Sequence, residues 1–149
     1  MFLNDVTRAD YDELINVWEA SVRATHDFLT EKDILFFREL ILDKYFDLVK
    51  LKCVRNSSGV ILGFLGTTPE KIEMLFIRPE SRGTGVGKYL VQYAVDELGI
   101  RLVDVNEQNT QAVGFYYALG FALIKRSPLD GMGKPYPVLH LRIDHNLKF

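Results

Sequence analysis

The stretch KIEMLFIRPESRGTGVGK, residues 71–88, combines a strand pattern, a loop and the start of a helix. Its apolar run at 71–77 predicts a strand, Arg78-Pro79 closes that strand, and a glycine-rich loop leads into a segment with helical spacing. The first N–H groups of a helix lack partners inside it and the helix dipole is positive there, so this order of elements is typical of an anion site. Three glycines at alternate positions also let the backbone approach a phosphate closely. Residues 82–88 are therefore predicted to bind a phosphate group.

Strand and helix patterns alternate on both sides of this stretch. Two cap-like pairs, Thr7 with Asp10 and Thr30 with Asp33, predict the starts of two N-terminal helices, separated by a turn or helix end at 23–28. Apolar runs bounded by turn residues predict strands, and longer periodic segments predict the later helices. This order predicts a single mixed-sheet α/β domain. The predicted strands are 2–6, 48–55, 60–67, 71–77, 101–105, 122–127 and 138–143, and the predicted later helices are 86–98 and 110–119.

The composition argues against several classes of protein. The 149 residues include 18 Lys+Arg and 20 Asp+Glu, and the resulting net charge of −2 disfavours a nucleic-acid binder that works by overall positive charge. No stretch offers the ~18 consecutive apolar residues of a membrane span, so no membrane partner is expected. Cys53 is the single cysteine and the three histidines show no paired spacing, so neither a disulfide nor a metal site is predicted. We expect a protein of the reducing cytoplasm.

Two other phosphate-binding motifs fit the loop less well. A P-loop reads GxxxxGK followed by Ser or Thr, whereas Arg82 occupies the first glycine position and Tyr89 follows Lys88. A dinucleotide-binding loop reads GxGxxG, whereas the spacing here is GxGxG. Asp104 ends the next predicted strand, as that fold requires, but too few βα units follow the loop to complete it. A third interpretation is therefore favoured over both.

Three segments together resemble the GNAT (Gcn5-related) N-acetyltransferases. The loop 82–87 resembles that family's pyrophosphate loop, Q/R-x-x-G-x-G/A, and residues 71–79 resemble its fourth strand and the Pro-containing turn after it. Residues 109–121 resemble its N-x-x-A-x-x-F-Y-x-x-x-G-F segment. Residues 21–29 and 133–141 are further similar to its YjaB-like bacterial subgroup. The resemblance implies a GNAT-like acyl-CoA N-acyltransferase fold with about seven strands and about four helices.

The resemblance also implies an activity. A single GNAT domain over residues 1–149 would transfer the acetyl group of acetyl-CoA to a primary amine by direct attack in a ternary complex, because a thioester is already activated and needs no enzyme nucleophile. The acceptor would be a small-molecule or peptide amine that the sequence does not identify, and a homodimer is possible. A non-catalytic acyl-CoA-binding regulatory module is the alternative function. Arg23, Asp27, Lys134 and Tyr136 are candidates for the acceptor pocket.

The resemblance assigns cofactor contacts residue by residue. The loop would cradle the pyrophosphate of acetyl-CoA through backbone N–H groups, and the end of the strand before it would pair with the pantetheine arm as an added half-strand. Asn109 would contact the cofactor or orient the helix that follows it. The predicted cofactor-binding residues are Leu75, Phe76, Ile77, Arg82, Gly83, Thr84, Gly85, Val86, Gly87, Lys88 and Asn109.

Three residues are candidates for proton transfer. Tyr116 matches the family's tyrosine that protonates the departing thiolate, although its helical spacing from Ala112 also suits a buried core tyrosine. Glu73 lies on the strand beside the cofactor, where its carboxylate would accept a proton through water or simply face solvent. His26 falls in the connection between the first two helices, which borders the acceptor pocket in this family. Asp104, or water alone, is the other candidate for the base.

Overall fold

The computed structural model describes residues 1–147, and every predicted strand and helix has a counterpart in it. The predicted fold class is confirmed, since the chain forms a mixed sheet with helices on both sides. The elements in chain order are β1 (Leu3–Asp5), the 3₁₀ turn η1 (Arg8–Asp10), α1 (Tyr11–Thr25), α2 (Glu31–Leu40), the π-helical turn η2 (Ile41–Tyr45), α3 (Phe46–Leu48), β2 (Lys50–Arg55), β3 (Ile61–Thr67), β4 (Lys71–Ile77), the 3₁₀ turn η3 (Pro79–Ser81), α4 (Val86–Gln92), the π-helical turn η4 (Tyr93–Glu97), β5 (Leu102–Asn106), α5 (Thr110–Leu119), β6 (Ala122–Ser127) and β7 (Val138–Arg142).

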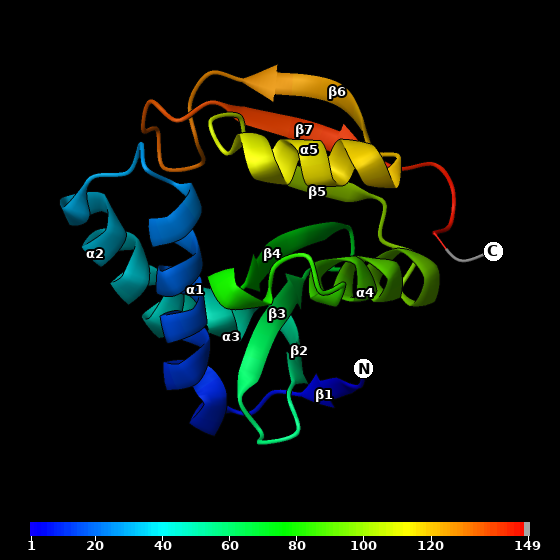
Figure 1. The fold of residues 1–149 in the computed structure, drawn as a ribbon. Coiled ribbons are helices and arrows are strands. Elements are labelled where there is room, and N and C mark those ends of the chain that lie inside the picture. The colour runs from blue at the N-terminus through cyan, green and yellow to red at the C-terminus, as the bar shows by residue number, and fades with distance from the viewer. Residues whose placement is uncertain (148–149) are drawn as a thin grey trace.

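The sheet has seven strands in the order β1-β2-β3-β4-β5-β7-β6. Only β4 and β5 pair in parallel among the described strands, and the other neighbours are antiparallel. Two parallel neighbours need a crossover connection, and α4 provides it by returning the chain to the start of β5. Figure 1 shows α4 and α5 on the same side of the sheet, flanking the place where β4 and β5 meet.

Local hydrogen bonds confirm the predicted starts of the N-terminal helices. The backbone N–H of Thr7 donates to the Asp10 carboxylate (2.9 Å), and the Thr30 hydroxyl accepts from the N–H of Asp33 (3.1 Å). Such contacts satisfy groups that the first turn of a helix leaves without partners. The first helix ends at Thr25, inside the segment predicted as a turn or helix end.

The helix predicted over 86–98 is less uniform than its sequence spacing indicates. After α4 the chain widens into the π-helical turn η4, in which the N–H of Leu98 bonds back five residues to the carbonyl of Tyr93 (3.2 Å). A π turn fits one extra residue into the helix. Both Ala94 and Val95 are buried as a result, at 0% and 1% exposure.

The half of the sheet from β1 to β4 is covered on both faces. Phe64 of β3 packs into a cluster with α1, α2 and α3, whereas its neighbour Leu65 packs into a second cluster beneath α4. Successive residues of a strand point to opposite faces, so a strand buried on both sides is apolar throughout, as β3 is. Cys53 on β2 is 0% exposed, which confirms its interpretation as a small buried hydrophobe.

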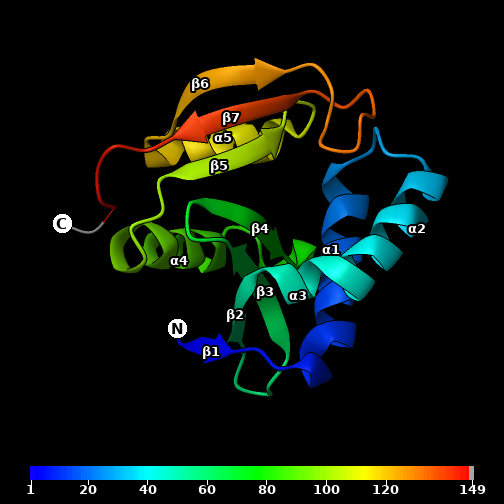
Figure 2. The same ribbon diagram turned by 180° about the vertical axis from the view of Figure 1, so that it is seen from behind.

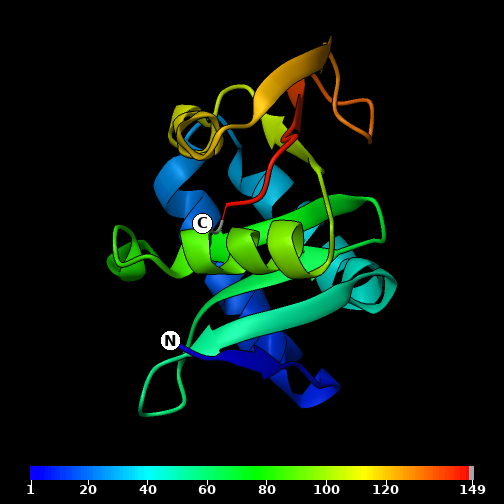
Figure 3. The same cartoon turned by 90° about the vertical axis from the view of Figure 1, so that its right-hand side faces the viewer.

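The half formed by β5, β7 and β6 is covered on one face only. Val103, Val105, Leu139 and Leu141 point into the cluster beneath α4 and α5. The residues between them point the other way, and Figure 2 shows none of the described helices in front of β5 and β7 on that side. Viewed from the side in Figure 3, this half diverges from the half that contains β2 and β3. We call its uncovered surface the open face.

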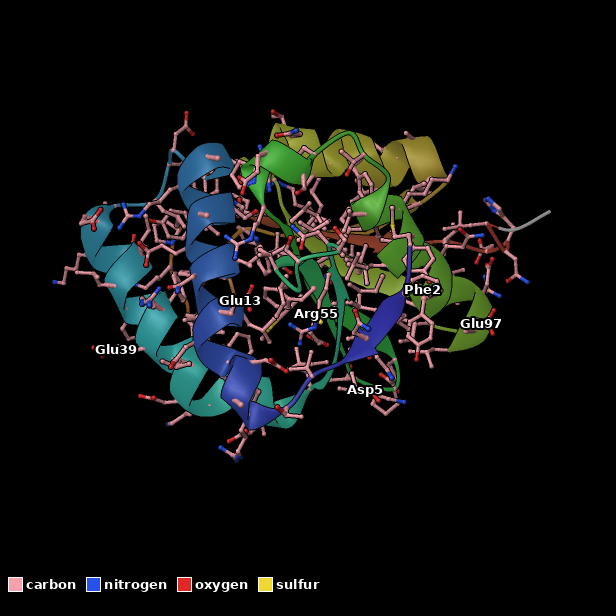
Figure 4. All side chains as sticks on the ribbon, turned by 60° about the horizontal axis from the view of Figure 1, so that its bottom comes forward. Phe2, Asp5, Glu13, Glu39, Arg55 and Glu97 are labelled. Carbon is pink, nitrogen blue, oxygen red and sulfur yellow. The ribbon has the colours of Figure 1, made fainter. Side chains whose placement is uncertain are left out.

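Polar contacts fix the first helix against the hairpin of β2 and β3. The Glu13 carboxylate accepts from the backbone N–H of Ile61 (2.7 Å), and Arg55 forms an ion pair with Asp10 (3.1 Å). Figure 4 labels Glu13 and Arg55, which lie between α1 and this hairpin. These contacts hold the body of α1 on the covered half and leave the end of the helix, with Thr25, beside the glycine loop.

The two halves part where β4 meets β5. The strands pair only at Lys71↔Leu102 and Ile72↔Val103 within the described chain. Toward β3, Gly66 pairs with Met74 and Thr67 with Ile72, which leaves Glu73 as the extra residue of a β-bulge. Beyond this point no described strand pairs with the edge of β4 that faces β5, so its backbone N–H and C=O groups are open to a ligand. The opening between the strands is the natural place for a ligand.

Candidate functional site

A cavity of about 370 Å³ fills this opening on the side of α4 and α5. Its walls come from the end of β4, the glycine loop, the first turn of α5 and the last turn of α1. All the predicted cofactor-binding residues line it except Thr84, whose hydroxyl instead donates to the carbonyl of Ser81. Sequence reasoning did not identify the other residues of the wall, which are Ser21, Thr25, Ser81, Gln111, Ala112 and Phe115.

The glycine loop presents its backbone to the cavity. Gly83 and Gly85 have φ angles of 74° and 91°, in the left-handed region that side chains disfavour. The first N–H to bond back into α4 is that of Tyr89, to the carbonyl of Gly85 (3.0 Å). The N–H groups from Val86 to Lys88 precede this bond and have no intrahelical partner, so they can receive an anion.

Close packing also fixes the third glycine of the loop. A Cβ atom on Gly87 would lie 3.3 Å from the ring of Phe115, so a larger residue would push α4 away from α5. No atom lies within 4 Å of a Cβ built on Gly83, so the space beside that residue is open. A ligand with phosphate groups therefore has both room and donors at this end of the cavity.

Two cations flank the loop. Arg82 donates to the side chain of Gln111 (3.3 Å) and to the carbonyl of Ser21 (3.4 Å). Neither Arg82 nor Lys88 forms an ion pair with a carboxylate in the part of the chain that the structure describes. Both charges are therefore available to phosphate groups.

Tyr116 lines the inner part of the same cavity. The residue is 5% exposed, and it packs edge-on against Phe115 and Phe121. Burial alone raises the pKa of its phenol well above the ordinary range, because no charged or hydrogen-bonding side chain within residues 1–147 contacts the hydroxyl. The side chain is thus both a core residue, as its helical spacing indicates, and a protonated phenol among the residues that line the cavity.

Asn109 begins the helix that carries this tyrosine. Its side-chain oxygen accepts from the N–H of Ala112 (3.2 Å), so it caps α5, and it also lines the cavity. An N-cap of this kind contributes about 1 kcal/mol to a helix. The predicted alternatives for Asn109, orienting the helix or contacting the cofactor, are compatible with one another.

His26 reaches the cavity from the end of α1. Burial, and secondarily the nearby Arg82, lowers the pKa of its imidazole to about 4. Its Nδ1 lies 2.8 Å from the hydroxyl of Thr25. The ring is therefore neutral at physiological pH, in contact with the cavity, and a weak base.

The two carboxylates considered as bases lie outside this cavity. Glu73 is exposed at the β-bulge and accepts from the hydroxyl of Thr68 (3.0 Å). Asp104 points to the open face, where it binds Lys71 and His140. Both are near the parting of β4 and β5, but on the side opposite the cavity wall formed by Tyr116.

The residues suggested for the acceptor pocket do not form one cluster: Arg23 lies on the surface of α1, whereas Lys134 and Tyr136 contact α2. Arg23 binds Glu19 and Glu31 on the surface of α1, and it does not line the cavity. Lys134 and Tyr136, from the segment between β6 and β7, both bind the Asp33 carboxylate of α2. The hydrogen bond from Tyr136 and the charge of Lys134 lower the pKa of Asp33, and this bond raises the pKa of Tyr136 to about 12.

The described residues also bear on membrane and metal binding. No helix among residues 1–147 is both long and apolar enough to cross a membrane. The same part of the chain contains no group of three or more His, Cys, Asp or Glu side chains arranged to hold a metal ion.

Known proteins are similar to this chain in sequence and in fold. A sequence profile described as "Acetyltransferase (GNAT) domain" matches residues 51–123. The chain belongs to this family of acetyl-CoA-dependent N-acetyltransferases, as the resemblance of the three segments implied. "Peptidyl-lysine N-acetyltransferase YjaB" of Salmonella typhimurium is 42% identical over 130 residues, which cover 87% of this chain and 89% of the relative.

Solved structures support the same assignment. The solution structure of apo-form YjaB from Escherichia coli superimposes with a TM-score of 0.85 at 36% identity, over 95% of each chain. The predicted similarity to the YjaB-like subgroup is therefore confirmed. The PaiA N-acetyltransferase of Thermoplasma acidophilum, solved in complex with coenzyme A, shares the fold with a TM-score of 0.74 at 19% identity, over 95% of this chain and 98% of that one.

Proposed function

We propose that this enzyme transfers the acetyl group of acetyl-CoA to the ε-amine of a lysine side chain in a protein or peptide, by direct attack in a ternary complex. One observation carries the proposal: a single cavity joins a loop of unpaired N–H groups at one end to the phenol of Tyr116 further in. The lysine acceptor is suggested by the YjaB relatives, which are named peptidyl-lysine N-acetyltransferases.

The glycine loop would hold the anionic part of the cofactor. The N–H groups from Gly83 to Lys88 would receive the pyrophosphate, with the cations of Arg82 and Lys88 beside it. The free edge of β4 from Leu75 to Ile77 would hydrogen-bond the pantetheine arm like an added strand. Acetyl-CoA supplies an acyl group that is already activated, so the protein's task is positioning and proton transfer.

The same edge of β4 would polarise the thioester. A backbone N–H of Phe76 or Ile77 that faces the opening would stabilise the oxyanion as the amine attacks the carbonyl carbon. Such a donor is most effective where water is excluded, and the side chains of Leu75 and Phe115 make this part of the cavity apolar.

Tyr116 would act on the leaving group. Because burial raises its pKa, the phenol carries its proton at neutral pH and can donate to the thiolate as the C–S bond breaks. A high pKa also makes the phenol a weak acid. Its contribution would therefore come from a hydrogen bond, already aligned, to a sulfur whose charge develops in a dry cavity.

Acetyl transfer to lysine peptides, measured by mass spectrometry, tests the proposed function. We expect Tyr116→Phe to lower kcat about 10²-fold, since it removes the donor and keeps the ring packing. Tyr117→Phe is the matched control, because that ring is 44% exposed and lies outside the cavity, and its turnover should equal wild type.

Two results would contradict the proposal. A protein that binds acetyl-CoA but acetylates none of a broad set of lysine peptides would favour the regulatory-module alternative or another acceptor. A Tyr116→Phe variant with unchanged turnover, when rapid-quench kinetics show that chemistry limits the rate, would remove this tyrosine from the mechanism.

A further inference from the structure

Four polar side chains form a hydrogen-bonded chain across the open face. Lys71 Nζ lies 2.7 Å from Asp104 Oδ2, and Asp104 Oδ1 lies 2.6 Å from His140 Nδ1. His140 Nε2 lies 2.7 Å from the hydroxyl of Ser127. The four residues come from β4, β5, β7 and β6 in that order across the sheet. The acetyl-transfer steps described above use none of them.

The position of this chain suits the acceptor side of the reaction. Asp104 directly follows Val103, the last residue of β5 that pairs with β4, so the chain begins where the strands part. The cofactor cavity opens on the side of α4 and α5, whereas Asp104 and His140 alternate with core residues of β5 and β7 and therefore face the uncovered side. An amine must enter from a side that the cofactor leaves free. A depression of about 210 Å³ lies on that side, lined in part by Lys71, Asp104 and His140.

Both ring nitrogens of His140 have an oxygen partner. Asp104 accepts a hydrogen bond at Nδ1, and the Ser127 hydroxyl can either donate to Nε2 or accept from it. An imidazolium at this position would therefore have an oxygen partner for each N–H. The ring is also accessible, since the side chains of Asp104 and His140 are 32% and 24% exposed.

Other charges face the same ring. Lys71 lies behind Asp104 on β4, and Lys125 is the cross-strand neighbour of His140 on β6. Arg142, two residues along β7, is held by Asp144 (2.7 Å). Asp104 is thus the carboxylate in direct contact with the ring.

We propose that His140 takes up the proton of the acceptor amine and that Asp104 positions it, an inference that rests on the proposed acetyl transfer. Before attack, the ammonium gives a proton to a chain of water molecules in the depression, which leads across the open face to the Ser127 oxygen on β6. Ser127 passes its own proton to Nε2 of His140. Asp104 keeps the Nδ1–H tautomer and stabilises the imidazolium, as the carboxylate does in Ser–His–Asp triads. The neutral nitrogen then forms the C–N bond as the C–S bond breaks, and the thiolate takes the proton of Tyr116. The second proton leaves the nitrogen through water and restores the Tyr116 phenol, so that the products are the amide and the free thiol. The imidazolium finally releases its proton to solvent.

The first test compares two histidine variants. His140→Gln keeps hydrogen-bonding groups but cannot take up a proton, and His145→Gln is the control on an exposed residue near the C-terminus. With saturating acetyl-CoA, we expect His140→Gln to lower kcat/KM for a lysine peptide about 10²-fold and to flatten the fall in rate below about pH 7. The affinity for acetyl-CoA, measured by calorimetry, should change less than twofold. A wild-type pH profile in His140→Gln would overturn the proposal. It would also be overturned if the fall in rate below about pH 7 disappeared in His26→Gln but persisted in His140→Gln.

The second test needs no acceptor. In ¹⁵N NMR spectra of the wild-type enzyme, neutral His140 should carry its proton on Nδ1, and Asp104→Asn should move that proton to Nε2. An unchanged tautomer of His140 in Asp104→Asn would overturn the proposal whether or not an acceptor is found. An acetyl group on Ser127, detected by mass spectrometry during turnover, would also overturn it, because Ser127 would then be a nucleophile. A wild-type enzyme that acetylates no lysine peptide but passes the NMR test would contradict the proposed function alone.

Discussion

The two halves of the sheet bury their strands in different ways. β2, β3 and β4 lie between α1, α2 and α3 on one face and α4 on the other, whereas β5, β7 and β6 have helical cover on one face only. In the first half, both faces of the strands are therefore buried in the core. The second half keeps one face for polar side chains, among them Asp104 and His140.

This difference separates structural from chemical tasks. The covered half holds the glycine loop and the edge of β4 in fixed positions, because the strands beneath them are packed from both sides. The other half has a depression of about 210 Å³ on its open face, which is the place proposed for the acceptor. The opening where the halves part is thus bordered by the cavity beneath α4 and α5 on one side. On the other side it is bordered by the partly exposed, charged side chains of the open face.

The largest expected effect comes from a cavity in the covered half. Phe64 is 0% exposed and packs against Phe46 and Phe76, with ring centroids 5.8 and 5.7 Å away. Phe64→Ala should lower the free energy of unfolding by about 3–5 kcal/mol. Urea denaturation measures this change. A decrease in the free energy of unfolding of less than about 1 kcal/mol would show that Phe64 of β3 contributes little to the core of this half.

An intermediate effect is expected where the two halves are tied together. Tyr136, from the segment between β6 and β7, donates to the Asp33 carboxylate of α2, and Tyr136→Phe removes this bond. A hydrogen bond to a charged group contributes about 1.5 kcal/mol, so the variant should be less stable by about that amount at pH 7.

The pH dependence of this effect follows from the carboxylate. Because the pKa of Asp33 is lowered in the folded state, its stabilisation is present above the ordinary Asp value of about 3.9 and is lost as the pH falls through the folded value. The stability difference between wild type and Tyr136→Phe should therefore shrink below about pH 4. A difference that grows in acid would contradict this assignment of the bond.

The smallest effect on stability is expected on the open face. His140→Gln should change the free energy of unfolding by about 0.5 kcal/mol or less, since the side chain is on the surface and glutamine can keep a hydrogen bond. The same variant is expected to impair acetyl transfer strongly. A large loss of stability in thermal melts would instead make His140 a structural residue and weaken the contrast between the halves.

Much of the cavity proposed for acetyl-CoA could be predicted, because the sequence patterns that indicate its lining residues are local. The glycine loop, its two cations and the start of α5 each depend on residues close together in the sequence, and helical spacing placed Tyr116 on the same face as Ala112 and Phe115. The π-helical turn η4 left no comparable signal, because its apolar spacing over 93–97 also fits an ordinary helix. Ser21 and Thr25 reach the cavity only through the packing of α1.

The arrangement of side chains on the open face, where the acceptor is proposed to bind, could be predicted only in outline. Alternation in Leu139-His140-Leu141 indicates a polar residue on the face opposite the core, but it does not say what that residue meets. Asp104 lies 36 residues away in sequence and reaches His140 because β5 and β7 are antiparallel neighbours in a particular register. Asp33 and Tyr136 are 103 residues apart and meet through the path of a loop.

The sequence by itself determined the class of fold, the glycine loop before α4 and the family, since these depend on periodicity, caps and glycines that act over a few residues. Tertiary structure alone decided which strand edge stays unpaired, which face of the sheet stays uncovered and which charged groups touch across strands. Such contacts depend on strand order and register, which are set by the packing of the whole chain rather than by any one segment.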